Sequence, residues 1–198
     1  MGTRLVSFDH NLQRARELVG LGVAIAGITV GSVDASDMLR AAIVQGVAAL
    51  DAYIHGVVLD LSVDIILGRR IRGSKTQIGL DFGAVGDLLS SGPGTDIELV
   101  AIGHVNDRIS RETFQRPDDI ARALAMVGIN QIWSTAFGAG ANAAKTELAL
   151  IVSRRNAIVH SCDTDPSNPG AISDLAGADV TAALSTLRTI VHAIDLLV

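Results

Sequence analysis

The sequence predicts an all-α fold in a single domain of 198 residues. The chain has 48% hydrophobic residues and a mean hydropathy of +0.40, so a sizeable core can form. Only 3% of the residues are aromatic, which leaves a core of Ala, Val, Ile and Leu and suits interlocked helices. Apolar residues recur at helical spacing over long segments, and we find neither an alternating strand pattern of useful length nor an internal repeat.

The N-terminal part is expected to begin with a short amphipathic helix over residues 8–18. A glycine-broken apolar run follows it as far as residue 33. Within the one domain, residues 1–35 thus form a helix with a glycine-rich extension, and residues 36–198 form the helical core.

The apolar run from residue 18 to residue 33 contains no charged residue. It is shorter than the roughly 20 apolar residues that a membrane span needs. Asp9 and Glu17, upstream of it, also conflict with a signal peptide. Because Cys162 is the single cysteine, an intrachain disulfide is excluded. We therefore expect a cytoplasmic protein without membrane association.

A long central helix is expected over residues 38–67, after Asp34 and Asp37 offer N-cap chemistry. Asp51 lies among its apolar positions. These positions keep helical spacing: Leu39, Ile43, Val47, Leu50, Ile54, Val57 and Val58.

Residues 68–94 predict a loop, a short helix and a second loop, and residues 96–111 predict a further helix. The first loop carries four basic residues: Arg69, Arg70, Arg72 and Lys75. These side chains could hold RNA phosphates, and a solvated loop is the alternative interpretation.

The next helix is expected to begin at Pro117, with Asp118 and Asp119 at its positive end and Gly128 just past its last turn. A short helix over residues 129–137 should follow.

Two helices complete the prediction. Asn142 could cap one of them over residues 143–160, and a turn-rich loop over residues 163–169 should follow it. The last helix, over residues 179–197, is expected to bury four apolar side chains: Leu184, Leu187, Val191 and Ile194.

We predict no metal site and no cofactor. The five histidines are scattered, and none has metal-ligand spacing to another histidine or to Cys162. Asp51 and His55 share a helical face and could bind a metal or each other, and the structural pair is favoured because further ligands are missing.

The segment that carries chemistry is residues 148–160. Arg155 falls in the middle of an apolar stripe formed by Leu148, Ile151, Val152 and Val159. A guanidinium keeps its charge, so a buried position demands an anionic partner or an open pocket. Arg154 projects to another side, where water can solvate it.

Arg155 and His160 are five residues apart, which is about 140° around a regular helix. They can meet only if the helix ends or distorts near His160, or if a second subunit completes the site. Asn156 and His160 are four apart and share a face.

A histidine can take a proton from a ribose 2′-hydroxyl, and a neighbouring arginine can hold the phosphate and stabilise its growing charge. Arg155 and His160 therefore suit metal-independent cleavage of RNA, which leaves a cyclic phosphate. The alternative is a surface arginine near a histidine that complements the C-terminal end of the helix.

The Arg-Asn-x-x-x-His pattern of residues 155–160 resembles the motif of the HEPN superfamily, and its surroundings resemble the RiboL-PSP-HEPN group. Residues 39–54 and 114–133 add to the resemblance, which extends over roughly residues 36–198. It implies a helical bundle that is usually dimeric, in which two protomers face a common cleft. Many members are endoribonucleases of toxin–antitoxin, phage-defence or RNA-processing systems, and some are non-catalytic modules.

Carried over by motif position, Arg155 and His160 would be catalytic and Asn156 a polar helper. Asp51 lies where such proteins often have an acidic residue, and it is an accessory candidate together with Arg154; a packing role is the alternative for Asp51. Some toxins of the superfamily have a Tyr where Cys162 stands here, so regulation through that Tyr is not expected.

The expected partners are RNA, a second copy of the chain, and an antitoxin or sensor protein. The net charge of −5 argues against nucleic-acid binding through bulk electrostatics and leaves room for a local basic patch.

Overall fold

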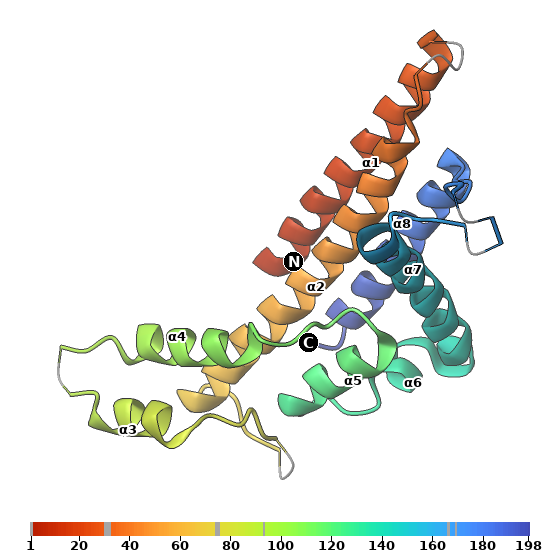
Figure 1. Cartoon of the computed structure of the whole chain (residues 1–198). Helices are drawn as coiled ribbons and strands as arrows, with labels where there is room; N and C mark the ends of the chain where they lie inside the picture. Colours follow the sequence, from red (N-terminus) through yellow and green to blue (C-terminus); the bar gives the residue numbers. More distant parts are fainter. Residues whose placement is uncertain (1, 30–32, 74–75, 93, 166, 169) are drawn as a thin grey trace.

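The computed structural model describes residues 2–29, 33–73, 76–92, 94–165, 167–168 and 170–198 (Figure 1). All regular elements in these ranges are helices, and the one β-bridge, Thr164 with Ile172, is isolated. The all-α prediction is thus confirmed. The helices in chain order are α1 (Thr3–Thr29), α2 (Ser36–Ile66), α3 (Phe82–Ser90), α4 (Ile97–Ile109), α5 (Pro117–Met126), α6 (Ile132–Phe137), the 3-10 turn η1 (Gly138–Gly140), α7 (Ala141–Ser161) and α8 (Gly177–Asp195).

The core lies around α2, the long central helix, which packs against α1, α4, α5, α7 and α8. Figure 1 shows α1 and α2 as an antiparallel pair, with α7 and α8 beside them. Leu12 of α1, Leu50 and Ile54 of α2, and Leu184 and Leu187 of α8 are fully buried where these helices meet. Interlocked aliphatic side chains therefore hold the bundle together, as the low aromatic content predicts.

The N-terminal helix is longer than predicted. α1 runs from Thr3 to Thr29 and continues through the glycines that were expected to break it after residue 18. A glycine costs about 1 kcal/mol in a helix interior. Gly20 and Gly27 have nothing within 4 Å of an added Cβ atom, whereas Gly22 is buried against α2. At Gly22 a Cβ atom would lie 3.0 Å from Cβ of Met38 and 3.3 Å from the carbonyl oxygen of Ala35, so the small residue lets α1 approach α2 closely.

The start of α2 also differs in detail from the prediction. The residue before its first turn is Ala35, which makes no side-chain cap, whereas Asp34 Oδ1 accepts a hydrogen bond from the Ser36 N–H group at 2.8 Å. By length and hydropathy α2 could cross a membrane, and 61% of its most apolar stretch is buried inside the fold. A central helix of a helical bundle is packed in the same way.

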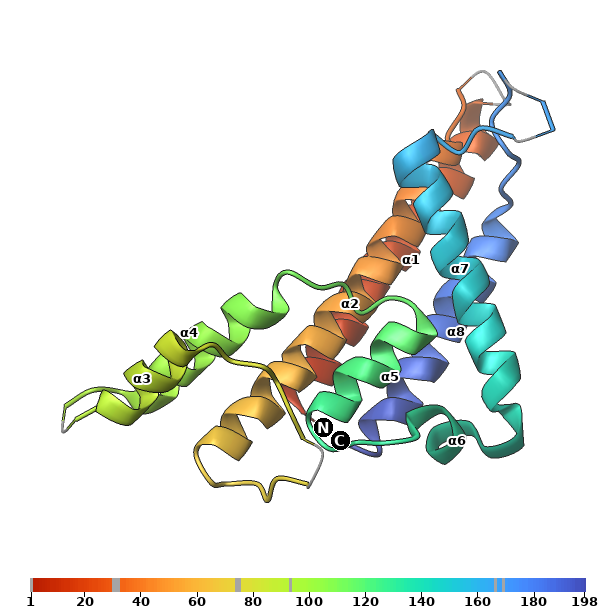
Figure 2. The same cartoon turned by 60° about the horizontal axis from the view of Figure 1, so that its bottom comes forward.

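Helices α3 and α4 form an arm on one side of the C-terminal half of α2 (Figure 2). Aspartate caps define both helices: Asp81 accepts from the Ala84 N–H group, and Asp96 accepts from those of Glu98 and Leu99. The sequence predicted α4 over residues 96–111, close to its observed bounds, and a short helix without stated bounds where α3 lies.

Helix α5 begins at Pro117 as predicted, and Gly128 follows its end with a φ of +90°. The prediction for α7 was wrong in one respect. The helix begins at Ala141 directly after η1, so Asn142 lies inside its first turn and caps nothing.

Candidate functional site

Helix α7 carries the motif residues, and it remains regular through all of them. The α-helix ends only at Ser161, where Cys162 takes a left-handed conformation with a φ of 49° and its N–H group bonds to the Ala157 carbonyl. The predicted helix end therefore lies after His160 and does not bend this residue toward Arg155. In one chain the two side chains leave the helix about 140° apart.

Arg155 is half-buried and has no carboxylate partner among the described residues. Its Nη1 donates to Oδ1 of Asn156 at 3.0 Å, and its Nε is buried without a hydrogen-bond partner. The apolar stripe expected around it is shorter than predicted, because Val152 is buried and Val159 is 45% exposed. Arg155 thus lies where the buried face of α7 gives way to solvent.

His160 is exposed in the last turn of α7, and its side chain makes no hydrogen bond or ion pair within the described part of the chain. Asn156, one turn earlier, is half-buried beside Arg155. The structure therefore joins Arg155 to Asn156 and leaves His160 free at the surface.

Arg154 is partly buried and paired with Asp163, whereas the sequence predicted a side chain that water solvates. Its Nη2 donates to Oδ2 of Asp163 at 2.8 Å and also lies 3.2 Å and 3.1 Å from the carbonyl oxygens of Ser173 and Asp174. Its Nε, like that of Arg155, is buried and unpaired. These contacts tie α7 to the segment that leads into α8, which is a structural role.

Asp163 is buried, with 1% of its surface exposed, between Arg154 and a second arginine that sequence reasoning missed. Arg40 of α2, only 8% exposed, donates from Nε to Asp163 Oδ2 at 2.9 Å and from Nη2 to the Ser173 carbonyl at 2.8 Å. Two guanidinium groups thus share one carboxylate, and we call Arg40, Arg154 and Asp163 the buried clamp. A charged residue inside the apolar pattern of α2 was the signal that could have indicated it.

Asp51, the accessory candidate, holds a loop. Its Oδ1 accepts from the Phe114 N–H group at 2.6 Å and lies 3.6 Å from Nδ1 of His55. The His55 ring lies against the Phe114 ring, with centroids 4.3 Å apart. No hydrogen bond or ion pair joins Asp51 to Arg155, Asn156 or His160 in the described ranges, so its observed contacts are those of a packing residue.

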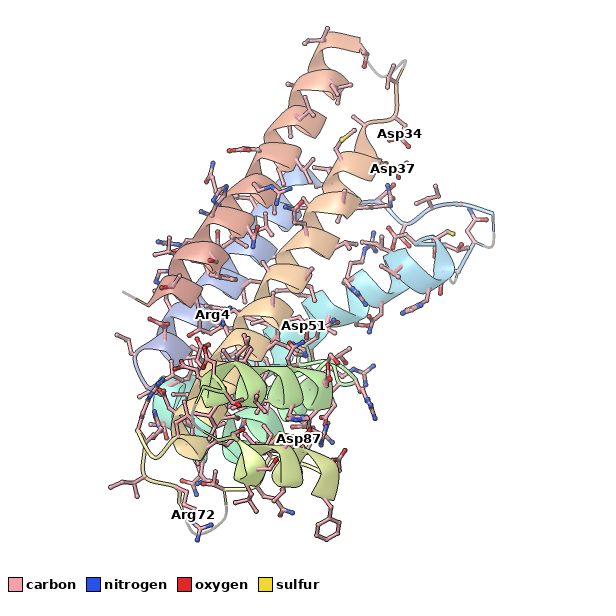
Figure 3. The ribbon with its side chains drawn as sticks, turned by 90° about the vertical axis from the view of Figure 1, so that its left-hand side faces the viewer. Arg4, Asp34, Asp37, Asp51, Arg72 and Asp87 are labelled. Atoms are coloured by element: carbon pink, nitrogen blue, oxygen red, sulfur yellow. The ribbon has the colours of Figure 1, made fainter. Side chains whose placement is uncertain are left out.

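The basic loop after α2 lies far from the motif. Asp37 and Arg72 appear near opposite ends of the molecule in Figure 3. The clamp residue Arg40 is in the second turn of α2, and the helix runs about 40 Å from there to its end. Arg69 is bound by Glu98, with Nη1 and Oε1 3.0 Å apart.

The other basic residues of this loop are Arg70, Arg72 and Lys75. Arg70 is half-buried and Arg72 is exposed, whereas Lys75 lies outside the described residues. The structure does not bring this loop near α7 of the same chain.

A groove of about 890 Å³ does lie beside the motif, between the start of α5 and one face of α7. Asn156 lines it, together with neutral polar residues and with charged residues of both signs, among them Asp118 and Asp119. Sequence reasoning did not identify it, since its two walls come from separate helices.

In the described ranges, no three His, Cys, Asp or Glu side chains gather closely enough to hold a metal ion. No match was found when the chain was compared with protein-family models, with curated proteins and with solved structures. The likeness of residues 155–160 to the HEPN motif stays a prediction.

Proposed function

We propose that this chain is a metal-independent endoribonuclease of HEPN type that cleaves single-stranded RNA in a toxin or phage-defence role. The observation that carries the proposal is the contrast between two adjacent arginines. Asp163 neutralises Arg154, whereas Arg155 has only the amide oxygen of Asn156. A guanidinium that is positioned but not neutralised can bind a phosphate.

In the proposed reaction the ribose 2′-hydroxyl attacks the adjacent phosphorus, and the bond to the 5′-oxygen of the next nucleotide breaks. His160 takes the proton of the 2′-hydroxyl or supplies one to the leaving oxygen. Arg155 holds the phosphate and stabilises the charge that grows on it. Asn156 orients Arg155 through its side-chain oxygen. The products are a 2′,3′-cyclic phosphate and a 5′-hydroxyl end.

The active unit is proposed to be a homodimer. Arg155 and His160 diverge on a regular helix, so one chain alone does not aim both at one phosphate. His160 is exposed and unpartnered within the described residues, so it is accessible to a second copy. A two-fold axis beside the end of α7 would place Arg155 of one protomer near His160 of the other.

The second candidate function is a non-catalytic module that binds RNA or a protein. The divergence of Arg155 and His160 within one chain favours this alternative. Only cleavage assays separate the two functions, because both use the same surface of α7.

The test is cleavage of single-stranded RNA by purified protein in excess EDTA. Wild type should produce cyclic-phosphate ends, and Arg155→Ala and His160→Ala should each lose activity by at least about a hundredfold. His10→Ala removes another exposed histidine, on α1, and should cut like wild type. An oligonucleotide of the same sequence with 2′-deoxyribose at every position should remain intact, because it lacks the attacking hydroxyl. If cutting requires added magnesium, or the His160 variant cuts normally, the nuclease proposal fails.

A complementation assay tests the shared site. Mixing the inactive Arg155→Ala and His160→Ala proteins should restore activity, to about a quarter of wild type after random exchange, because half of the dimers then contain one intact site of two. An active wild type whose variants never complement would place both residues of a site in one chain.

A further inference from the structure

The groove between α5 and α7 follows α7 for much of its length. Its lining runs from Asn142 in the first turn of α7 to Asn156 in the motif, a rise of about 21 Å along the helix. Its opposite wall begins at Arg116, directly before α5. An elongated groove of this kind can accommodate several units of a linear polymer, and it ends beside Arg155.

Two positive charges in this groove lack a counter-ion. Arg116 is exposed and Lys145 is half-buried, and neither has an ion pair or side-chain hydrogen bond within the described parts of the chain. Arg122, a third cation of the groove, is bound to Asp119. Asp118 is the remaining acidic residue of the lining, so the groove carries a net positive charge on a chain whose net charge is −5.

Neutral polar groups continue the lining between the charges and the motif. Thr146 and Ser153 are exposed and lie two turns apart on α7, and Asn156 lies about one turn after Ser153. The side-chain oxygen of Asn156 accepts from Arg155, which leaves its NH₂ group free to donate into the groove. Hydroxyl and amide groups of this kind bind phosphate and sugar oxygens without reading base identity.

We infer that this groove binds the sugar–phosphate backbone of single-stranded RNA, with Arg116 and Lys145 contacting phosphates and Asn156 directing the strand to Arg155. The inference rests on the proposed function and names how its substrate is held. A small free phosphate compound would bind only one of the positive charges, whereas an RNA strand would contact the groove along its whole length.

Binding can be tested without cleavage. The probe is a short fluorescein-labelled single-stranded RNA with 2′-O-methyl riboses, which cannot react by 2′-hydroxyl attack, and the readout is fluorescence anisotropy. Arg116→Ala and Lys145→Ala should each raise the Kd about tenfold. The double variant should lower the salt dependence of log Kd by about 0.7 per lost phosphate contact. Lys145→Arg, which keeps the charge, should bind like wild type.

Arg14→Ala is the matched control, because it removes an exposed arginine of α1 that lies outside the groove lining. If this variant lost as much affinity for the probe as the groove variants do, the overall charge of the protein would explain the loss, and this result would overturn the inference. So would wild-type affinity in the double variant, or a wild type that does not bind the probe. Competition by inorganic phosphate at micromolar concentration would identify a free phosphate compound as the ligand and would also overturn it.

The two proposals fail separately. If the groove variants lose probe binding but the wild type cuts no RNA under any condition, the RNA-binding groove is supported and the nuclease proposal is refuted. If the wild type cuts RNA, and the double variant cuts RNA and binds the probe as well as wild type does, the nuclease proposal is supported and the RNA-binding groove is refuted.

Discussion

Nη2 of Arg154 lies 2.8 Å from Oδ2 of the buried Asp163, whereas Arg155, the next residue of α7, reaches only the side-chain oxygen of Asn156. Adjacent helical residues point about 100° apart, so the two arginines serve different neighbours. Arg154 completes the buried clamp with Arg40, and Arg155 keeps its charge available. Substitution of Arg154 should therefore mainly change stability, and substitution of Arg155 should mainly change activity.

The first prediction concerns the clamp. Asp163→Ala should destabilise the fold by about 3–5 kcal/mol, because it leaves the partly buried Arg154 without a counter-ion and the nearly buried Arg40 with only the exposed Asp37, whose Oδ1 lies 3.6 Å from its Nη1. Arg154→Ala should cost less, since Arg40 and Asp163 remain paired. Urea denaturation followed by circular dichroism measures both.

Arg155→Ala is the matched comparison for Arg154→Ala. It removes no ion pair and should change the free energy of unfolding by less than about 1 kcal/mol, while it abolishes RNA cleavage. Equal stability loss at both positions would contradict the division of roles.

The second prediction separates packing from catalysis at Asp51. Asp51→Ala removes the acceptor of the Phe114 N–H group and should lower stability by about 1–3 kcal/mol. Asp51→Asn keeps an acceptor oxygen and should retain most of the stability. Both variants should cut RNA at wild-type rates below their melting temperatures, and loss of cleavage in the stable Asn variant would make Asp51 part of the site.

The third prediction concerns the contact of α2 with α8 at Gly46. A Cβ atom there would lie 2.5 Å from Cδ2 of the fully buried Leu184 and 3.1 Å from Cδ1 of Leu187. Overpacking costs about 1–3 kcal/mol and the better helix propensity of Ala returns up to about 1 kcal/mol, so Gly46→Ala should be destabilising overall.

Gly103 of α4 supplies the control for Gly46. Nothing lies within 4 Å of its added Cβ, so Gly103→Ala should stabilise the protein by up to about 1 kcal/mol. Thermal unfolding of both variants tests the pair, and a stabilised Gly46→Ala protein would show that the α2–α8 contact is looser than the structure indicates.

The fourth prediction is a dependence of stability on pH through Asp9. Partial burial opposes ionisation of this carboxyl, but hydrogen bonds and charges from His192 and Arg188 outweigh burial and hold its pKa below the ordinary value of 3.8. A lowered folded-state pKa contributes stability above the unfolded-state pKa, and this stability is lost as pH falls through the folded-state value.

The effect is small because the groups are partly exposed and water screens them, so we expect less than about 1 kcal/mol. Asp9→Asn should be less stable than wild type at pH 6, and the difference should vanish near pH 2. Urea denaturation across this range measures it, and a difference that grows toward low pH would refute the assignment.

Much of the fold could be predicted from local sequence signals. Pro117 acts within one turn, so it marks the start of α5 without help from the rest of the chain. The spacing of apolar residues likewise predicted α2 almost to its ends.

The candidate site could be predicted only in part. The motif residues and their helix were identified, and their separation around α7 followed from helix geometry. The buried clamp as a whole could not be found in this way, because Arg40 and Asp163 are 123 residues apart in the chain. The groove at Asn156 was also missed, since α5 and α7 form its walls jointly.

The sequence by itself determined the helical class, most helix boundaries and the placement of the motif residues on one helix, because these depend on interactions within a few turns. Only the tertiary structure decided that α1 continues through its glycines, that Asp163 neutralises Arg154 and that Arg155 stays unneutralised. Close packing and charge burial depend on which distant segments meet, and helical periodicity contains no information about that.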